Sequence, residues 1–405
     1  MIKKRYLLCT RIPIFRKVTG DLYCDPLWAK DLKYHLDYIE DFSLCCPVVE
    51  ITDASDILEM TNISKFQITK LFPLKKDAGL GSIVKNFLPN WVQIVHASRY
   101  AEVIHSGGAG WAFPLSFYLL FIKPFIKFQW IVVIESSFWM LRKNEKVTCR
   151  KFFEHHLHTI MLRQCIKLAD ARVFTQTFYK DYFTADEDRI LIAPATWVEP
   201  ENILPLDAIA EKHLKPKKKA LDILFPSRME ENKGVFVVLE AIRLLSIKLH
   251  TPVNITLMGS GSLSSECIQF SNVDHGFINV QYESPVEYGA KFFHKLADYD
   301  LVIVANLAEE QPRIIFDSFS QGVPVIASNT TGIEDITKDN VNALLYQRGS
   351  AADLTRKLLY VIENPSSLKS LATEALKSVE SKTHIQMHKD RALFLEKILS
   401  NGQSK

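Results

Sequence analysis

The 405-residue sequence lacks the features that mark secreted, disulfide-bonded and membrane-spanning proteins. Its seven cysteines include no CxxC pair, and Cys45 and Cys46 adjoin inside an apolar run, which is typical of a reducing compartment. The first apolar run stops at Arg11, too early for a signal-peptide core. Residues 111–134, the most hydrophobic stretch, are interrupted by prolines and lysines, and their longest uncharged run is well short of the roughly 20 residues that span a bilayer. We expect a cytoplasmic protein, either soluble or peripheral on the inner face of the cytoplasmic membrane.

Composition indicates a globular protein without a strong charge bias. Apolar residues make up 47% of the chain and charged residues 23%, and the length is sufficient for two full hydrophobic cores. The net charge of +3 divides into +4 for residues 1–205 (26 basic, 22 acidic) and −1 for the remainder (23 basic, 24 acidic). Two interpretations of the weakly basic half stay open: ordinary solvated surface, or contact with an anionic membrane or acidic acceptor.

Short β-branched or aromatic runs alternate with segments of helical period, most clearly in the second half. There we expect helices over 235–249 and 312–321, and strands over 221–226, 253–258, 280–282, 300–305, 323–328 and 343–346. Near-continuous apolar strands separated by helices are typical of a parallel sheet covered on both faces. The sequence thus predicts an α/β protein with two doubly wound, Rossmann-like domains that face an interdomain cleft.

The first half shows the same alternation less clearly. Helices are expected over 28–38 and 151–169, and strands over 5–9, 48–51, 102–105, 130–134 and 171–175. Residues 197–220, with three prolines and the basic run 215–219, have the composition of a linker. We expect one domain in residues 1–205, a second in 206–384, and a C-terminal helix in 385–405 that packs back on the first domain.

Cationic residues follow the first strand of the second domain. Arg228 and Lys233 lie in SRMEENKG, directly before a helix, and a helix N-terminus beside two cations suits a diphosphate. Taken alone, they are equally well explained as solvated loop charges. The next strand ends in MGSG, where Gly259 and Gly261 allow a ligand to approach the backbone. The full GxGxxG pattern is missing, so a nicotinamide cofactor gets little support.

An acidic pair, Glu309 and Asp317, flanks the start of a later helix. Glu309 follows an apolar strand, and Asp317 lies about one turn into the helix, so both acids can face one cleft. Pro312 suits the first helical position. The free amides of Arg313, Ile314 and Ile315 would then point at an anion. The alternative is a helix-capping Glu309 and an Asp317 on the polar helix face.

These motifs occur in a fixed order along residues 220–365. Strand and SRMEENKG are followed by strand and MGSG, then by EEQPRIIFDSFSQGVPVIAS, then by TTGIEDI. Together they resemble the donor domain of GT-B glycosyltransferases of the group 1, or GT4-like, family. The resemblance implies a nucleotide-sugar donor bound by residues 206–384 and an acceptor bound by residues 1–205. It also implies transfer of a hexosyl unit to a glycan or lipid-linked acceptor, with retention, in polysaccharide or lipopolysaccharide biosynthesis.

The resemblance assigns a role to each acid and each cation. Arg228 and Lys233 would hold the donor diphosphate and stabilise the departing nucleotide. Glu309, the first acid of the family's E-x7-E motif, would contact hydroxyls of the transferred sugar. Asp317 would accept hydrogen bonds from the ribose, although the family has Glu there and Asp is one methylene shorter.

Other residues would bind the nucleotide. By the same resemblance, the amides around Ile314 and Ile315 would contact the distal phosphate, and the base would lie near the strand that ends in Tyr282. Gly259 and Gly261 would line this pocket. The family fold does not need a metal, because cations and helix ends carry the charge, so we expect no metal and no cofactor. We also expect no nucleic-acid partner. Two alternatives stay open: a sugar-nucleotide epimerase, or an inactive scaffold or glycan-binding protein.

The first half offers two candidate catalytic residues. Glu135 follows the strand 130–134, where the family often has His, and it is either a sugar-binding or basic group or a capping residue. His105 precedes a Gly-rich loop and either faces the cleft or packs beside a turn. The aromatic run 113–128, with Lys123 and Lys127, is either a buried helix or a contact for a lipid-linked acceptor. The histidines at 155, 156 and 158 are expected to lie on a solvated helix face.

Overall fold

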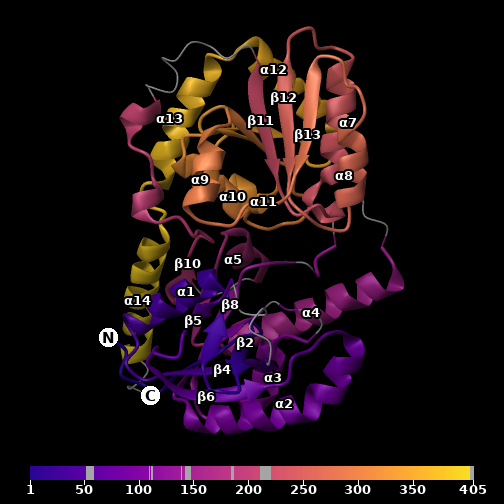
Figure 1. Ribbon diagram of the computed structural model, residues 1–405. Coiled ribbons are helices and arrows are strands. Elements are labelled where there is room, and N and C mark those ends of the chain that lie inside the picture. Colours follow the sequence, from indigo (N-terminus) through magenta and orange to yellow (C-terminus); the bar gives the residue numbers. More distant parts are fainter. Residues whose placement is uncertain are drawn as a thin grey trace. The chain divides into compact units, whose positions relative to one another are not determined.

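The computed structural model describes residues 1–401, apart from residues 52–58, 109, 111–112, 138, 142–146, 184–186 and 210–219. Two compact units make up the chain: Met1–Ala193 with His388–Lys405, and Pro194–Met387. The C-terminal segment therefore groups with the first unit (Figure 1). The basic run 215–219 of the expected linker lies outside the described residues.

The first unit is built on a mixed sheet of ten described strands, ordered β10-β9-β8-β7-β1-β4-β2-β3-β5, with β6 also paired to β4. The strands are β1 (Tyr6–Cys9), β2 (Ile14–Lys17), β3 (Leu22–Cys24), β4 (Phe42–Ile51), β5 (Thr61–Asn62), β6 (Ile68–Leu74), β7 (Val103–Gly107), β8 (Gln129–Ile134), β9 (Ala171–Phe174) and β10 (Ile190–Ile192). Pairing is parallel from β10 through β4, and β3 is antiparallel to both β2 and β5.

Helices cover both faces of this sheet. They are α1 (Pro26–Leu36), α2 (Leu80–Tyr100), α3 (Leu115–Ile122), α4 (Cys149–Leu168), α5 (Phe178–Phe183) and, from His388 on, α14 (His384–Asn401), with a 3-10 turn η2 (Glu187–Arg189). A core of aromatic and aliphatic side chains joins the sheet to α2, α3 and α4. Most of α3 is buried in this core, as the buried-helix interpretation of the aromatic run predicts. No described helix is long and apolar enough to cross a membrane.

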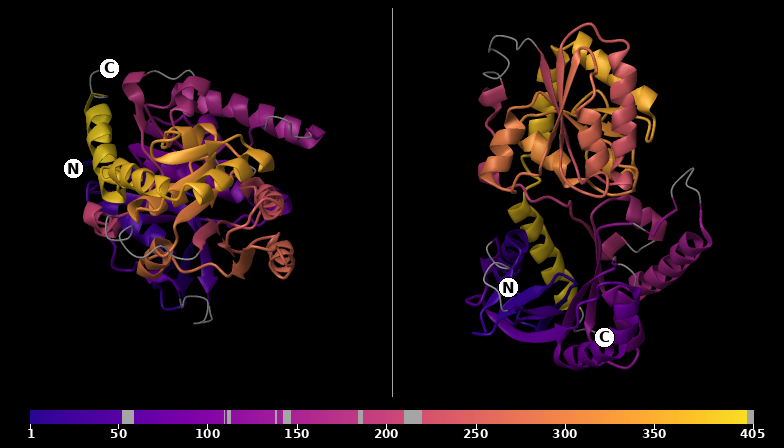
Figure 2. Two further views of the ribbon diagram at one scale, coloured as in Figure 1. Left: turned by 90° about the horizontal axis from the view of Figure 1, so that it is seen from above. Right: turned by 45° about the vertical axis from the view of Figure 1, so that its right-hand side comes forward.

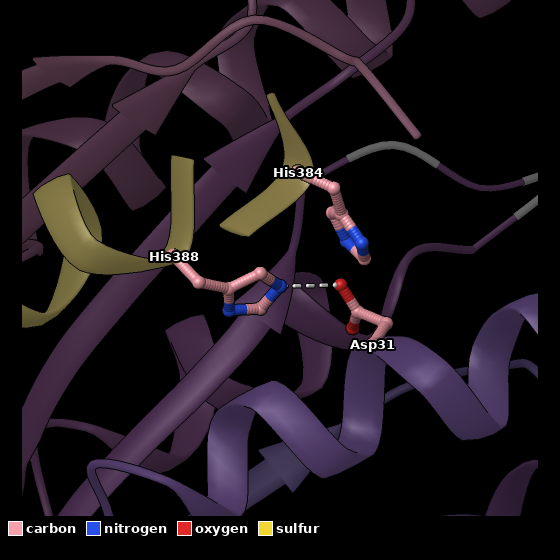
Figure 3. A group of neighbouring side chains, drawn as sticks. All are labelled: Asp31, His384 and His388. Carbon is pink, nitrogen blue, oxygen red and sulfur yellow. Dashed lines mark hydrogen bonds and ion pairs between the residues drawn. The ribbon is translucent and has the colours of Figure 1, made fainter. Parts of the chain in front are cut away.

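The other face of the first sheet carries a largely buried polar cluster beneath α1 and α14. Its members are Tyr6, Asp31, His35, Tyr38, His105, His388 and Arg391. The Tyr6 hydroxyl lies 2.9 Å from His105 Nδ1. His388 Nε2 of α14 points at Asp31 Oδ1 of α1, at 2.9 Å (Figure 3). His384, also drawn in Figure 3, belongs to the second unit, where its Nδ1 lies 3.5 Å from a Glu199 carboxylate oxygen.

Burial lowers the pKa of two histidines of this cluster, His388 and His105. Loss of hydration lowers the pKa of His388 to about 3, against the opposing hydrogen bond to Asp31. The same cause, with the nearby Arg391 charge, holds the pKa of His105 well below its usual range. An Arg guanidinium thus shares the cluster with neutral imidazoles.

The first unit is expected to lose stability on acidification. The pKa of histidine in an unfolded chain is about 6.5. Below about that pH the unfolded chain binds protons at these histidines, whereas the folded chain does not, because burial lowers their pKa. Stability therefore falls as the pH drops from about 6.5 toward the folded-state pKa of His388, about 3. Chemical denaturation followed by tryptophan fluorescence at a series of pH values measures this slope. His388→Gln should flatten it, whereas His294→Gln, at an exposed site on the second unit, should not; an unchanged slope in His388→Gln would contradict the account.

The second unit contains a fully parallel sheet of six described strands, ordered β13-β12-β11-β14-β15-β16. The strands are β11 (Leu221–Pro226), β12 (Val253–Met258), β13 (Ile278–Glu283), β14 (Leu301–Val304), β15 (Val325–Ser328) and β16 (Ala343–Tyr346). The helices are α7 (Val235–Ser246), α8 (Ser264–Ser271), α9 (Ala290–Ala297), α10 (Arg313–Ser320), α11 (Thr331–Glu334), α12 (Ala351–Glu363) and α13 (Ser367–Val379), with 3-10 turns η3 (Pro200–Asn202) and η4 (Glu231–Lys233).

Alternate side chains of these strands enter two separate cores. On β11, Ile223 and Phe225 pack with α7, α8 and α12, whereas Leu224 packs with α9, α10 and α11. Helices therefore lie on both sides of the strands (Figure 2). This arrangement confirms the predicted fold class of two Rossmann-like α/β domains.

Candidate functional site

A pocket opens in the second unit where β11 and β14 end. Because parallel strands place their carboxyl ends at one edge of the sheet, the loops that follow these two neighbours meet there. Three cationic side chains, Arg228, Lys233 and Arg313, line the pocket together with Ser227 and Asn306. The pocket therefore has the charge and the position that suit an anionic ligand.

The loop from β11 to α7 is fixed by close backbone packing. Gly234 ends the turn η4 with φ +76°, and a Cβ there would stand 2.0 Å from the Ala305 carbonyl oxygen. The Leu307 amide donates to the Asn232 carbonyl at 2.9 Å, which ties the same loop to the segment after β14. A side chain at Gly234 would push the two loops apart.

Lys233 is the residue where these two loops meet in an ion pair. Its ammonium group pairs with Glu310, whose Oε1 also accepts from Asn306 Nδ2 at 2.7 Å. Both charged side chains are largely shielded from solvent. The pair holds Lys233 in the wall of the pocket and balances its charge.

The glycines after β12 pack against the loop between β11 and α7. A Cβ at Gly259 would stand 1.8 Å from the Ser227 carbonyl oxygen, and one at Gly261 would stand 2.5 Å from that of Met229. Tyr282 donates its hydroxyl to the Gly259 carbonyl at 2.7 Å. These three residues fix the loop that carries Arg228; none of them is among the residues that line the pocket.

Helix α10 begins at the pocket. Pro312 lies just before its first residue, so the helix starts one residue later than predicted. Arg313 and Ile314 line the pocket, and Arg313 also lies over the Trp197 ring at 5.4 Å. Ile315 is fully buried, and its amide donates to the Pro312 carbonyl at 3.2 Å. The Ile315 amide is therefore not one of the free amides predicted at this helix start, because a tight turn already gives it an acceptor.

The first acid of the motif is engaged by two loops. Glu309 accepts at Oε2 from the Thr331 amide at 2.9 Å and from the Thr331 hydroxyl at 2.8 Å, and it forms an ion pair with Arg348. The Arg348 amide donates to Asn329 Oδ1 at 2.8 Å. Glu309 thus links the ends of β14, β15 and β16, and its charge is balanced within the protein.

The second acid is also engaged. Asp317 is 4% exposed on α10, and its Oδ1 accepts a hydrogen bond from the Tyr288 hydroxyl at 2.8 Å. Burial, followed by the neighbouring Asp317 charge, raises the pKa of Tyr288 well above its usual value. The phenol therefore remains a donor throughout the neutral range.

The two candidates of the first unit differ in environment. Glu135 directly follows β8 and is exposed. His105 lies inside β7, is 6% exposed and belongs to the buried cluster with Tyr6. That placement favours the packing interpretation of His105. The sequence positions 109 and 111 of its Gly-rich loop lie outside the described residues.

Sequence reasoning missed several residues that shape the site, namely Asn306, Glu310, Thr331, Arg348 and Tyr288. Arg348 follows β16, so the rule that function gathers after strands could have found it. Tyr288 carries no comparable signal, because only the folded loop brings it to Asp317.

Comparisons with known proteins match the second unit to a family and the chain to a fold. The family described as Glycosyl transferases group 1 matches residues 207–378. An uncharacterized glycosyltransferase, MJ1178 of Methanocaldococcus jannaschii, is 26% identical over 151 residues, 36% of this chain. The match spans only 40% of that relative's length.

Solved structures resemble the whole chain at low identity. Sucrose-phosphate synthase from Thermosynechococcus elongatus has a TM-score of 0.70 at 12% identity, covering 98% of this chain and 100% of that one. Anabaena Alr3699/HepE in complex with UDP has a TM-score of 0.62 at 12% identity, covering 99% and 100%. The lipopolysaccharide outer core galactosyltransferase WaaB has a TM-score of 0.62 at 13% identity, covering 96% and 99%. The ordered motifs, the fold and the family match agree: residues 207–378 match the group 1 glycosyl transferase family, and the chain has the fold of the GT-B glycosyltransferases.

Proposed function

We propose that this protein transfers a hexosyl unit from a nucleotide sugar to a hydroxyl of a glycan or lipid-linked acceptor. The observation that carries the proposal is the cationic pocket of Arg228, Lys233 and Arg313 at the carboxyl edge of the second sheet. Because the loops that form it are fixed to each other, the donor diphosphate would meet charges that are already in place.

The chemistry requires stabilisation of a leaving group. When the bond between the anomeric carbon and the diphosphate oxygen breaks, its electron pair stays on that oxygen, and Arg228 and Lys233 would stabilise the resulting charge. When the donor binds, Lys233 would leave its ion pair with Glu310 and pair with the phosphate instead, so its positive charge would stay balanced. The acceptor hydroxyl oxygen would bond to the anomeric carbon from the face of departure, which retains the configuration, and its proton would pass to the departing diphosphate oxygen. These cationic side chains supply the role that a metal has in other transferases, so we propose a metal-independent reaction without a cofactor.

The similar structures support one class of donor and one class of acceptor for this proposal. HepE structures hold UDP and UDP-glucose, and WaaB is a lipopolysaccharide galactosyltransferase, which supports a UDP-sugar donor and a role in cell-surface polysaccharide or lipopolysaccharide synthesis. Glu309 would contact the transferred sugar, held in position by Thr331 and Arg348. Exposed Glu135 would contact the sugar or acceptor, or act as a base.

Lys233→Ala is expected to lower turnover about 100-fold, because a preorganised charge at the leaving diphosphate is lost. UDP release from UDP-glucose or UDP-galactose in the presence of a glycan acceptor measures this rate, after thermal shifts with UDP, GDP and ADP have named the base. Lys291→Ala, at an exposed site on α9, is the matched control and should leave the rate unchanged. If the wild type binds nucleotide sugars but releases no nucleotide from any of them, the protein is a scaffold and the transferase proposal fails.

We further propose that the first unit docks on an anionic membrane through one face of α2. Leu80, Val84, Leu88 and Val92 recur every four residues on this helix, and each is more than half exposed. Phe125, after the neighbouring α3, is 87% exposed. A stripe of this kind lies in the interfacial region of a bilayer when basic residues accompany it.

The exposed charges on α2 and in the residues just before it are basic, because Asp77, which also precedes the helix, is buried in an ion pair with Arg11. Helix α2 contains Lys85 and Arg99 but no Asp or Glu, and the exposed Lys75 and Lys76 precede it. Each basic residue near an anionic surface contributes about 1 kcal/mol of binding free energy. This complementarity favours a negatively charged lipid surface as the occupant.

Val84→Glu with Leu88→Glu is expected to abolish binding to vesicles of anionic and zwitterionic lipid, because two charges enter the apolar stripe. Co-sedimentation with vesicles at low and high salt measures binding. Gln269→Glu with Ser370→Glu adds the same charge to exposed sites of the second unit and should leave vesicle binding intact. Equal binding of both variants, or none by the wild type, would refute membrane docking and leave the transferase proposal standing.

A further inference from the structure

Asp317 is the acid that the family resemblance assigns to the ribose, and its carboxylate is hydrogen-bonded to a tyrosine. Asp317 is almost wholly buried on α10, and Tyr288 donates its hydroxyl to Asp317 Oδ1 at 2.8 Å. Tyr288 is the less buried member of this pair. Of the two side chains, the tyrosine is therefore the one that stays partly accessible to solvent.

The Tyr288 ring is held from its own side of the site. It lies just before α9, in the segment that follows β13, at the carboxyl edge of the sheet. Its ring stacks on Phe292 and meets Phe293 edge-on, each with ring centroids 5.4 Å apart. Aromatic packing and the bond to Asp317 together fix the direction of the hydroxyl.

The hydrogen-bond capacity of this hydroxyl leaves room for a ligand. A phenol donates one hydrogen and accepts through its lone pairs. Burial, and then the charge of Asp317, raise the pKa of Tyr288, so the hydrogen stays on the oxygen and is donated to the carboxylate. The oxygen then accepts from a hydroxyl of the ligand, and it accepts more readily because the carboxylate polarises the O–H bond.

We propose that Tyr288 is the residue that contacts the nucleotide ribose in this protein, and that Asp317 positions it. The inference rests on the proposed function, and it names a ribonucleoside diphosphate as the ligand of this part of the site. An aspartate is one methylene shorter than a glutamate, and the Tyr288 hydroxyl fills the resulting gap. Asp317 thus acts through Tyr288 and is a positioning residue.

The test uses the full-length protein and a cycle of variants. Wild type, Tyr288→Phe, Asp317→Glu and the double variant are titrated calorimetrically with UDP, 2′-deoxy-UDP and 3′-deoxy-UDP. Tyr360→Phe, a half-exposed tyrosine on α12, is the matched control for loss of a phenolic hydroxyl. Thermal unfolding of each variant shows that it is folded.

Loss of one neutral hydrogen bond weakens binding about three- to tenfold. Tyr288→Phe should therefore bind UDP about three- to tenfold more weakly, yet bind one of the two deoxynucleotides as the wild type does, because that ligand lacks the contacted hydroxyl. Asp317→Glu alone should also weaken UDP binding, since its longer side chain collides with the phenol. The double variant should recover UDP binding, because glutamate reaches the place of the missing hydroxyl.

Two results would overturn the inference without touching the proposed function. One is wild-type UDP affinity in Tyr288→Phe. The other is an equal loss of binding affinity in Tyr288→Phe for UDP and for both deoxynucleotides, which would show that the hydroxyl has a structural role. If the wild type binds none of UDP, GDP and ADP, the proposed function fails and this inference fails with it.

Discussion

The site depends on one ion pair between neighbouring loops, Lys233 with Glu310. Because β11 and β14 are adjacent and parallel, their following loops must run side by side, and the contact at Gly234 leaves no space between them. Asn306 donates to Glu310, Glu310 pairs with Lys233, and Lys233 lines the pocket. A site assembled this way is positioned before any ligand arrives, which is the condition for electrostatic catalysis.

Each acid of the motif is charge-balanced or hydrogen-bonded inside the protein. Glu309 is held by Thr331 and Arg348, and Asp317 accepts from Tyr288. Partly buried charges without such partners would be costly, and here each has a partner within the protein. The proposed binding of a ligand at this edge of the sheet would exchange these partners, so the residues next to the motif would determine what the motif can contact.

Sequence reasoning succeeded where local pattern decides the structure. The strands 221–226, 253–258 and 343–346 were predicted with their observed bounds, since apolar β-branched runs between turns have few other solutions. Helix α2 was not predicted from the sequence, because Pro89 lies in its interior and its exposed face is apolar. The spacing of apolar residues therefore does not distinguish its buried face from its exposed face. The partners of Glu309 and Asp317 were also beyond reach, because they come from loops that only the folded sheet brings together.

The central claim is that the carboxyl edge of the second sheet binds the diphosphate of a nucleotide sugar. A crystal structure of the protein with UDP tests it most directly. The account predicts that the diphosphate lies within hydrogen-bonding distance of Arg228 and Lys233, at the start of α10, with Glu310 released from the lysine. A nucleotide bound elsewhere, with the Lys233–Glu310 pair intact, would contradict it.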